Sequence, residues 1–247
     1  MKNKLYVPVI LLAFITVAIV ACEKDPKQNT TPAPPAVVSN SWKEGFEDAG
    51  ALGGKGWVIV NNTDKIGQEA WRQGRFESTN KYTFGSDYVV GFPAYVGKKG
   101  PHDFISVDMY AGAATSNMSV WLISPRTKMK NGDQIIFYTR HHIDDGSFSS
   151  KDGNDRLQVR ANFTTGSALV GKIWTETGDF GNLLLDINPG LTLTGYPEIW
   201  TRFTITLAGI TGLVDGRFAF RYFVAGGGPD GNNASLVGVD ELEFKSN

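Results

Sequence analysis

Apolar and polar residues alternate along much of the chain after residue 40. In the stretch RLQVRANF, the apolar residues Leu157, Val159 and Ala161 alternate with polar ones. Successive side chains of a strand point to opposite faces, so a period of two indicates one buried face and one solvated face. The stretches RFTITL at 202–207 and RFAFRYFV at 217–224 repeat this pattern. These segments therefore predict strands with one apolar face each.

Further apolar stretches of strand length are separated by turn sequences. They are WVIV at 57–60, DYVVGF at 87–92, FISVDM at 104–109, SVWLI at 119–123 and QIIFYTR at 134–140. Asn-Gly and Asp-Gly pairs, which favour tight turns, recur along the chain. No segment after residue 40 follows a 3.6-residue period. The pattern predicts an all-β domain, with two antiparallel sheets packed face to face to bury the one-faced strands.

The N-terminus has a different pattern. Lys2 and Lys4 precede an apolar run from Leu5 to Ala21, which is typical of a secretory signal peptide. An uncleaved membrane anchor is the alternative, because the run is at the short end of what spans a bilayer. The run ends in Ile-Val-Ala-Cys, and Cys22 is the only cysteine of the chain. These four residues resemble the lipobox of bacterial lipoproteins, which implies that the chain is cleaved before Cys22 and acylated on its thiol. An incidental cysteine is the alternative.

The segment 22–40 is rich in proline, threonine and asparagine, and it has no periodic apolar pattern. Such a composition predicts an extended, disordered tether between the lipid and the folded domain at 41–247. The acidic residues Glu23 and Asp25 resemble signals that send some lipoproteins to the cell surface, although any charged flexible segment would look the same. We therefore expect a signal peptide at 1–21, an anchor in the outer membrane and display at the cell surface.

Composition and motifs exclude several classes of function. The net charge of −1 argues against a nucleic-acid partner. The only thiol is expected to be lipidated, and the nucleophile-elbow and phosphate-loop motifs are absent. The strand motif E-x-D-x-x-E of β-sandwich glycanases is absent as well. We therefore expect no catalytic activity. An undetected glycan hydrolase is the alternative, because the geometry of a carboxylate pair is not visible in a sequence.

Seven stretches together resemble a known family. They are SWKEGFED at 41–48, KGWVIVNN at 55–62, AWRQG at 70–74, SVWLISP at 119–125, NGDQIIFYTR at 131–140, DRLQVRAN at 155–162 and VGVDELEF at 237–244. In this order they resemble the choice-of-anchor J domain, a relative of the cleaved adhesin domains of bacterial gingipains. The resemblance implies a jelly-roll β-sandwich that is non-catalytic, lies at the cell surface and is similar to carbohydrate-binding modules. It also implies structural calcium.

Glu47 and Asp240 are the candidate calcium ligands. In an ideal strand Asp240 lies on the same face as Leu242 and Phe244, and a carboxylate on an apolar face needs a cation or a hydrogen-bond donor. Glu47 lies near the start of the domain, which we expect to run beside the last strand. The resemblance places acidic calcium ligands in the corresponding motifs. The alternatives are a salt bridge to arginine, backbone hydrogen bonds, or a shift of register that turns Asp240 outward.

The stretch HHIDDGSFSSKDGND is a second acidic segment. Its acids are Asp144, Asp145, Asp152 and Asp155, and their spacing does not match an EF-hand loop. We therefore interpret it as a solvated acidic loop rather than a cation site. The adjacent His141 and His142 would face opposite sides of a strand, so zinc is not expected.

Aromatic side chains are the candidate ligand-binding residues, because a flat ring matches the apolar face of a sugar. Trp57, Trp121 and Trp200 lie within or next to strand patterns and are expected in the core. Trp71 and Tyr95 lie in glycine-rich, polar surroundings and are expected to form an exposed platform, with Arg72 as a polar partner. We therefore expect a surface lipoprotein that binds a glycan or a host or matrix protein. A structural module of a surface assembly is the alternative.

Overall fold

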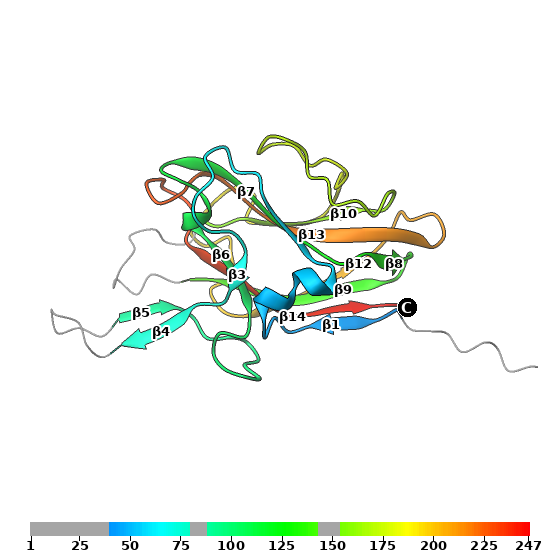
Figure 1. The fold of residues 1–247 in the computed structure, drawn as a ribbon, viewed down its shortest axis with the longest axis horizontal. Coiled ribbons are helices and arrows are strands. Elements are labelled where there is room, and N and C mark those ends of the chain that lie inside the picture. Colours follow the sequence, from blue (N-terminus) through cyan, green and yellow to red (C-terminus); the bar gives the residue numbers. More distant parts are fainter. Residues whose placement is uncertain (1–39, 80–87, 143–153) are drawn as a thin grey trace, which may run out of the picture. The chain divides into compact units, whose positions relative to one another are not determined.

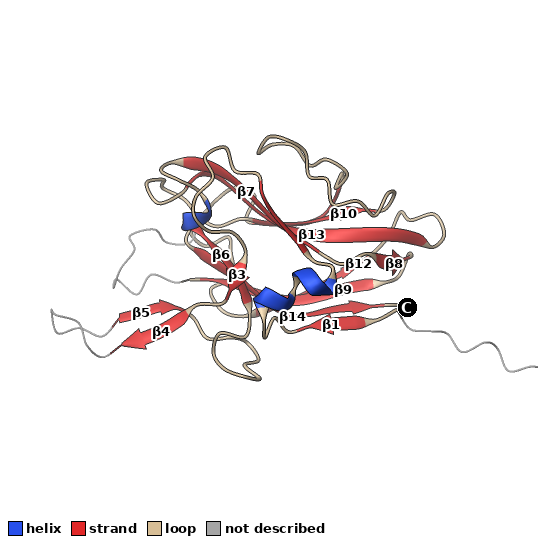
Figure 2. Cartoon of the chain, in the orientation of Figure 1, coloured by secondary structure: helices blue, strands red, loops and turns tan. Residues whose placement is uncertain are grey.

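The computed structural model describes residues 40–79, 88–142 and 154–247. Their regular structure consists of strands and three short 3-10 helices, η1 (Ala49–Ala51), η2 (Gly53–Lys55) and η3 (Met109–Ala111) (Figure 2). No helix in these ranges is long and apolar enough to span a membrane. The predicted signal peptide, the lipidated Cys22 and almost all of the predicted tether lie outside the described residues.

Two antiparallel sheets form the fold. Sheet A has the order β12 (Thr201–Thr206), β9 (Gln134–His141), β14 (Leu236–Lys245), β6 (Ile105–Asp108) and β3 (Arg72–Gln73), and β1 (Trp42–Glu44) also pairs with β14. Sheet B has the order β11 (Asn182–Ile187), β10 (Leu157–Asn162), β13 (Val214–Gly227), β7 (Ser116–Ile123) and β2 (Val58–Asn61), and β8 (Thr127–Met129) also pairs with β13. A separate hairpin joins β4 (Phe76–Thr79) to β5 (Tyr88–Gly91).

The two sheets lie face to face, and the chain crosses between them repeatedly (Figure 1). It passes from β6 in sheet A to β7 in sheet B, and it changes sheet again at each step from β11 to β14. The prediction of an all-β sandwich of two antiparallel sheets is therefore confirmed. Several strands were not predicted, among them β8 and β11. The sequence of β11, NLLLDI, has a run of leucines without alternation, so it carries no period-two signal.

The main hydrophobic core fills the space between the sheets. Phe218, Phe220 and Tyr222 of β13 point into it, as their period-two pattern predicts. The opposing side chains come from sheet A and include Phe137 and Phe244. Ring pairs lock the two layers together, with the rings of Phe137 and Phe220 at 4.9 Å and 75°. Aromatic pairs in this geometry contribute about 0.5–1.5 kcal/mol beyond their buried area.

A β-bulge in β14 changes which residues share a face. Val237 and Val239 belong to the main core, but the register with β9 shifts between Asp240 and Glu243, and Glu241 has a φ of 45°. The extra residue turns Leu242 and Phe244 back into the core. The ideal-strand expectation that Asp240 faces the same layer as these two residues is therefore wrong. Asp240 faces away from the main core together with Gly238, as the alternative of a register shift describes.

The first and last strands of the sandwich are neighbours. Trp42 of β1 is opposite Phe244 of β14. Beyond this pair, the Ser246 N–H donates a hydrogen bond to Ser41 Oγ at 2.9 Å. The Asn247 N–H donates to the buried carboxylate of Asp133 at 2.9 Å. The two ends of the folded part therefore meet at one corner of sheet A, and the expected proximity of the first and last strands is confirmed.

Candidate functional site

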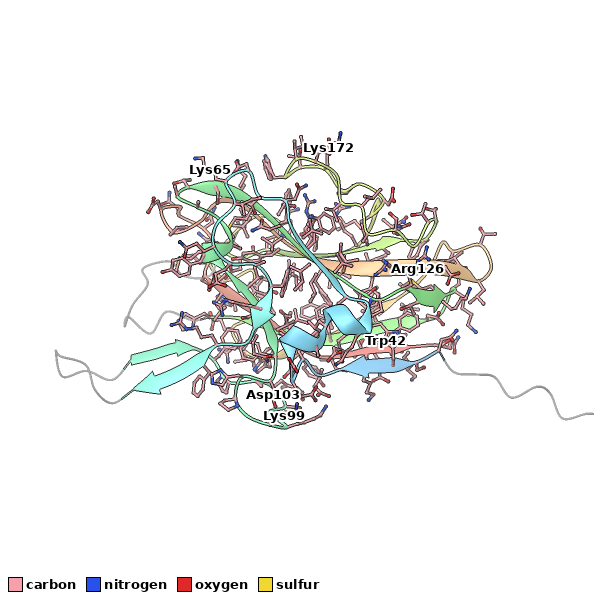
Figure 3. All side chains as sticks on the ribbon, in the orientation of Figure 1. Trp42, Lys65, Lys99, Asp103, Arg126 and Lys172 are labelled. Carbon is pink, nitrogen blue, oxygen red and sulfur yellow. The ribbon has the colours of Figure 1, made fainter. Side chains whose placement is uncertain are left out.

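The outer face of sheet B is covered by the segment 163–181, which joins β10 to β11. Val170 and Phe180 of this segment pack against Trp121, Ile123 and Ala219 and form a second, smaller hydrophobic cluster. Figure 3 shows Lys172 of the same segment on the side of sheet B that faces away from sheet A. At Ala219 and Arg221, the face of β13 that alternates with the main core is therefore buried rather than solvated.

Arg221 fixes this cover to sheet B. Its guanidinium donates to the carbonyl oxygens of Trp174 and of Glu176, and it lies 3.9 Å from the centre of the Phe223 ring. Only 1% of Arg221 is exposed. Burial of the guanidinium lowers the pKa of Arg221 to about 9, and the carbonyl oxygens take the place of water around it. The outer face of sheet B thus offers no open strand surface at these residues.

The outer face of sheet A is covered only in part. The loop between β5 and β6 places Phe92 and Phe104 against β14, where they meet Trp200 in a third small cluster. A Cβ on Gly238 would lie 2.7 Å from Phe92 and 2.9 Å from both Phe104 and Trp200. The absence of a side chain at Gly238 is what lets these rings approach the strand. Figure 3 shows Lys99 and Asp103 of the same loop on the side of the sandwich opposite Lys172.

Beside this loop, sheet A has an open depression with a volume of about 190 Å³. We call it the tyrosine depression. Its lining consists of Lys43, Tyr95, Ile136, Tyr138, Arg202, Glu241 and Glu243. Most of these side chains alternate with core residues of β1, β9, β12 and β14, so strand periodicity places them on the outer face. Tyr95 comes instead from the loop between β5 and β6.

The two tyrosines stack on each other. Their ring centres are 3.9 Å apart and the planes are inclined by 18°. Tyr138 belongs to the strand, and Tyr95 remains 43% exposed above it. The neighbouring Tyr138 side chain raises the pKa of Tyr95 above its ordinary value, so the Tyr95 phenol stays neutral at physiological pH. The pair provides a supported aromatic surface with hydroxyl groups at its edge. The prediction that Tyr95 is exposed is confirmed.

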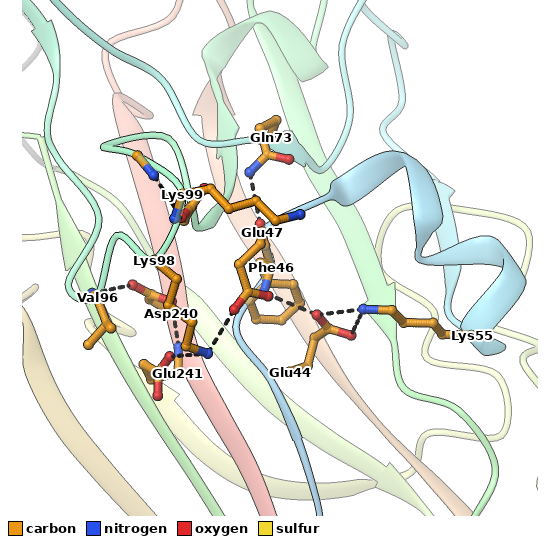
Figure 4. Close-up of polar contacts among 12 residues, drawn as sticks. Glu44, Phe46, Glu47, Lys55, Gln73, Val96, Lys98, Lys99, Asp240 and Glu241 are labelled. Atoms are coloured by element: carbon orange, nitrogen blue, oxygen red, sulfur yellow. Dashed lines mark hydrogen bonds and ion pairs between the residues drawn. The ribbon is translucent and has the colours of Figure 1, made fainter.

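Hydrogen bonds to the buried Asp240 and ion pairs of Lys98 hold the loop that carries Tyr95 (Figure 4). The carboxylate of Asp240 accepts hydrogen bonds from the N–H of Val96 at 3.0 Å and from the N–H of Glu241 at 2.6 Å. The ammonium of Lys98 lies 2.7 Å from Glu47 Oε1 and 3.3 Å from Glu241 Oε1. Burial raises the pKa of Asp240 to about 7, whereas the hydrogen bond with Lys98 lowers the pKa of Glu47.

Glu47 and Asp240, the expected calcium ligands, thus both contact the same loop. In this arrangement the cation beside Glu47 is the Lys98 ammonium, and the oxygens of Asp240 accept backbone N–H groups. No set of three or more His, Cys, Asp or Glu side chains comes together as a metal site among the described residues. Calcium takes six to eight oxygen ligands, so the arrangement suits an ammonium better than a calcium ion. Calcium binding by Glu47 and Asp240 stays a prediction.

Trp71 and Arg72 lie elsewhere. Trp71 is 3% exposed, belongs to the main core, and its indole N–H donates to the Val120 carbonyl at 3.0 Å. Arg72 forms ion pairs with Asp108 and, at 3.3 Å, with Glu69. The expectation of an exposed platform at Trp71 is therefore wrong. Its polar sequence neighbours belong to the short edge strand β3, while the indole itself fills space between the sheets.

The predictions for three other tryptophans agree better with the structure. Trp57 and Trp121 are buried, as expected, and Trp200 is partly buried at the edge of the loop cluster. Tyr138 and Arg202 were not predicted as site residues. A signal for both exists in the sequence, since each occupies the outward position of a strand whose inward positions are apolar. The sequence does not indicate which outward positions a loop will cover.

Asp155 differs from the expected solvated loop. It is fully buried and accepts hydrogen bonds from the Tyr222 hydroxyl and from the N–H and hydroxyl of Ser235. Burial alone would raise the pKa of Asp155, but the His141 ring, 3.6 Å from the carboxylate, and the hydrogen bonds from Ser235 and Tyr222 outweigh it and lower the pKa. Asp155, just before β10, therefore connects Tyr222 within β13 to Ser235, just before β14. Asp144, Asp145 and Asp152 lie outside the described residues.

Comparisons with known proteins give a distant likeness in fold. No protein-family model matches the chain, and no curated protein matches it. Among solved structures, the K1 cleaved adhesin domain of Lys-gingipain from Porphyromonas gingivalis W83 is 18% identical, with a TM-score of 0.45 over 84% of this chain and 98% of that one. The K3 domain of the same protein is 16% identical, with a TM-score of 0.47 over 83% and 98%.

A family 11 carbohydrate-binding module from Clostridium thermocellum, solved with a mixed-linked tetrasaccharide, is 11% identical. Its TM-score is 0.35, over 83% of this chain and 95% of that one. At these levels the likeness assigns neither a ligand nor a site. Membership of the choice-of-anchor J group stays a prediction.

Proposed function

We propose that residues 41–247 form a non-catalytic module that binds a glycan in the tyrosine depression. The observation that carries this proposal is the stacked pair of Tyr95 and Tyr138 in an open hollow of sheet A. A flat, partly exposed ring offers an apolar surface to the C–H face of a sugar. The hydroxyls and the charged groups around the rings offer hydrogen-bond partners to sugar hydroxyls.

The size of the depression favours a sugar over a protein partner. Stable protein–protein interfaces bury about 800 Å² on each side, whereas a hollow of about 190 Å³ suits a monosaccharide-sized group. The two acids in the lining, Glu241 and Glu243, each lie 3.3 Å from a lysine, Lys98 and Lys43 respectively. Ion-paired carboxylates fit a binding role better than acid–base catalysis, which needs one carboxyl group that carries a proton.

The test is a glycan-array screen of residues 41–247, followed by titration calorimetry with the best ligand. Tyr95→Ala and Tyr138→Ala should each weaken binding at least about tenfold, or about 1.4 kcal/mol. Tyr110 provides a matched control, because it is 46% exposed and lies on η3, outside the depression. Tyr110→Ala should leave the affinity unchanged.

Two results would overturn the proposal. One is an array without any glycan hit, and the other is an equal loss of affinity in the Tyr95, Tyr138 and Tyr110 variants. Binding of an extracellular protein in the absence of any glycan hit would favour the protein-ligand alternative. A hydrolysed glycan would favour an enzyme.

The proposal includes the cellular setting. An acylated Cys22 would hold the module in the outer membrane, and the segment 22–40 would let it reach ligands at the cell surface. The proposal also includes calcium at Glu47 and Asp240. The ion would bind there by taking the place of the Lys98 ammonium.

A further inference from the structure

The free charges around the tyrosine depression are positive. Glu243 pairs with Lys43 and Glu241 pairs with Lys98, so both acids of the lining already have a cation. Arg202 is exposed, and it makes no ion pair in the part of the chain that the structure describes. The chain as a whole has a net charge of −1. An uncompensated guanidinium at the open hollow is therefore not a consequence of an overall basic composition.

Strand pairing places Arg202 next to the aromatic surface. Arg202 of β12 is the register partner of Tyr138 of β9. Directly opposed residues of antiparallel strands have Cβ atoms about 4.5–5.5 Å apart, and both of these side chains lie on the outer face. Lys245 adds a second exposed cation on the same face, at the far end of β14, where it is opposite Gln134. Arg202 thus borders the side of the depression formed by Tyr138, and Lys245 lies beyond Glu243.

We propose that the glycan carries a carboxylate, and that Arg202 binds this carboxylate while the sugar ring stacks on Tyr95. This inference rests on the proposed function and names the class of its ligand, a hexuronic acid. A guanidinium presents two parallel N–H donors whose spacing matches the two oxygens of a planar carboxylate. A neutral sugar would use Arg202 only as an ordinary hydrogen-bond donor, so the charge would remain uncompensated.

The paired acids do not oppose such a ligand. The Lys43 and Lys98 ammonium groups offset the charges of Glu243 and Glu241, so an incoming carboxylate meets no free negative charge in the lining. Because Arg202 is exposed, its attraction is screened by salt. The affinity for an acidic sugar should therefore fall as the salt concentration rises, whereas the affinity for a neutral sugar should not.

The experiment compares hexuronic-acid oligosaccharides with their methyl esters, which keep the ring and lose the charge. Titration calorimetry on residues 41–247 should show about tenfold tighter binding of the acid than of the ester. Arg202→Ala should remove this difference, because it weakens binding of the acid far more than binding of the ester, and Arg202→Lys should keep part of the difference. Thr204→Ala, at the next outward position of β12, is the matched control and should change neither affinity.

The outcomes separate this inference from the proposed function. Equal affinity for acid and ester would overturn the inference that Arg202 binds a carboxylate of the glycan. An Arg202→Ala variant that keeps the difference would overturn it as well. Neither result contradicts glycan binding itself. Tighter binding of sulfated oligosaccharides than of uronic acids likewise overturns the carboxylate inference in favour of sulfate. If neither form binds and no neutral glycan binds, the proposed function itself fails, and the inference fails with it. Circular dichroism and melting curves of each variant verify that the fold is intact.

Discussion

Asp240 is a carboxyl group without contact to solvent, at the base of the loop that carries Tyr95. It has two backbone N–H donors, and the charge of its sequence neighbour Glu241 also disfavours ionisation of Asp240. Burial dominates and raises the pKa of Asp240 to about 7. The protonation of this single residue thus makes the attachment of the Tyr95 loop to β14 sensitive to pH.

The pH dependence of stability should show this effect. Between about pH 4 and pH 7 the native carboxyl retains its proton while the unfolded one has lost it, so the native state binds more protons and stability falls as the pH rises. Each unit of pKa difference is worth about 1.4 kcal/mol, which makes the total at most about 4 kcal/mol. Urea unfolding of the wild type and of Asp240→Asn at several pH values measures this.

The comparison with Asp240→Asn removes the contributions of other acids. Glu47, whose pKa is lowered, changes stability in the opposite direction at low pH, but it does so in both proteins. Asp240→Asn should therefore gain stability relative to the wild type as the pH rises from 4 to 7. Parallel pH profiles of the two proteins would contradict the assignment.

The same residues allow a direct test of calcium. If calcium takes the place of the Lys98 ammonium, millimolar calcium should raise the melting temperature of Lys98→Met more than that of the wild type, since the variant leaves Glu47 and Glu241 without a cation. Lys128→Met is a control, because Lys128 pairs with Asp215 and is similarly exposed. Identical melting temperatures in calcium and in chelator, in every variant, would show the calcium prediction to be wrong.

At the scale of elements, the loop between β5 and β6 connects packing to the site. Its first and last residues, Phe92 and Phe104, pack over Gly238, and Asp240 accepts a hydrogen bond from its Val96 N–H. Between Phe92 and Val96 the loop presents Tyr95. The position of the Tyr95 ring therefore depends on Gly238, a residue that itself contacts no ligand. The bulge in β14 is equally important, because it places Asp240 and Glu241 beside this loop.

Gly238→Ala should disturb this arrangement. The new methyl group would lie under 3.0 Å from three aromatic rings, which must move away from β14. Overpacking of this kind costs about 1–3 kcal/mol, and it should also weaken glycan binding because Tyr95 moves with the loop. Gly54→Ala on η2 is the control, since a Cβ there meets nothing within 4 Å. Equal unfolding free energies and equal affinities for both variants would contradict this role of Gly238.

Local patterns predict a large part of these elements. The alternation in β10, β12 and β13 identifies both the strands and their inward faces, because burial in a two-sheet sandwich selects every second residue. The pattern does not reveal what lies on the outward side. The segment 163–181 buries the outward side chain of Arg221, while the outward side chain of Arg202 stays open, and this difference depends on contacts between residues far apart in sequence.

The site is less predictable for the same reason. Tyr95 was found because its surroundings in the sequence are polar, but the same reasoning failed for Trp71, whose indole turns into the core. Likewise, the period of an ideal strand misplaced Asp240 because the bulge adds one residue to its face. Glu47 and Asp240 do reach the same loop, but the lysine that contacts Glu47 comes from that loop, more than fifty residues away from Glu47.

At the scale of the whole molecule, sheet B is covered on its outer side and sheet A carries the open hollow. A lipid anchor at Cys22, as proposed, would require such a face to reach its ligand, and the predicted tether at 22–40 would allow this in many orientations. The sequence pattern of residues 1–22 predicts this anchor.

The anchor has a decisive test in Cys22. Mass spectrometry of the native N-terminal peptide should find an acylated cysteine as the first residue of the mature chain. Cys22→Ser should release the protein from the membrane fraction, since a module without acyl chains has no hydrophobic attachment. Cys22→Ser is a clean substitution because the chain has no other cysteine. An unmodified thiol, or a variant that stays in the membrane fraction, would contradict the prediction.

The meeting of residues 41 and 246 at one corner of the sandwich has a practical consequence. Because the two ends are joined by strand pairing, a short peptide could bridge them and new ends could be opened in a surface turn. The same closeness suits insertion of the whole unit into an exposed turn of a carrier protein, which would then display the tyrosine depression.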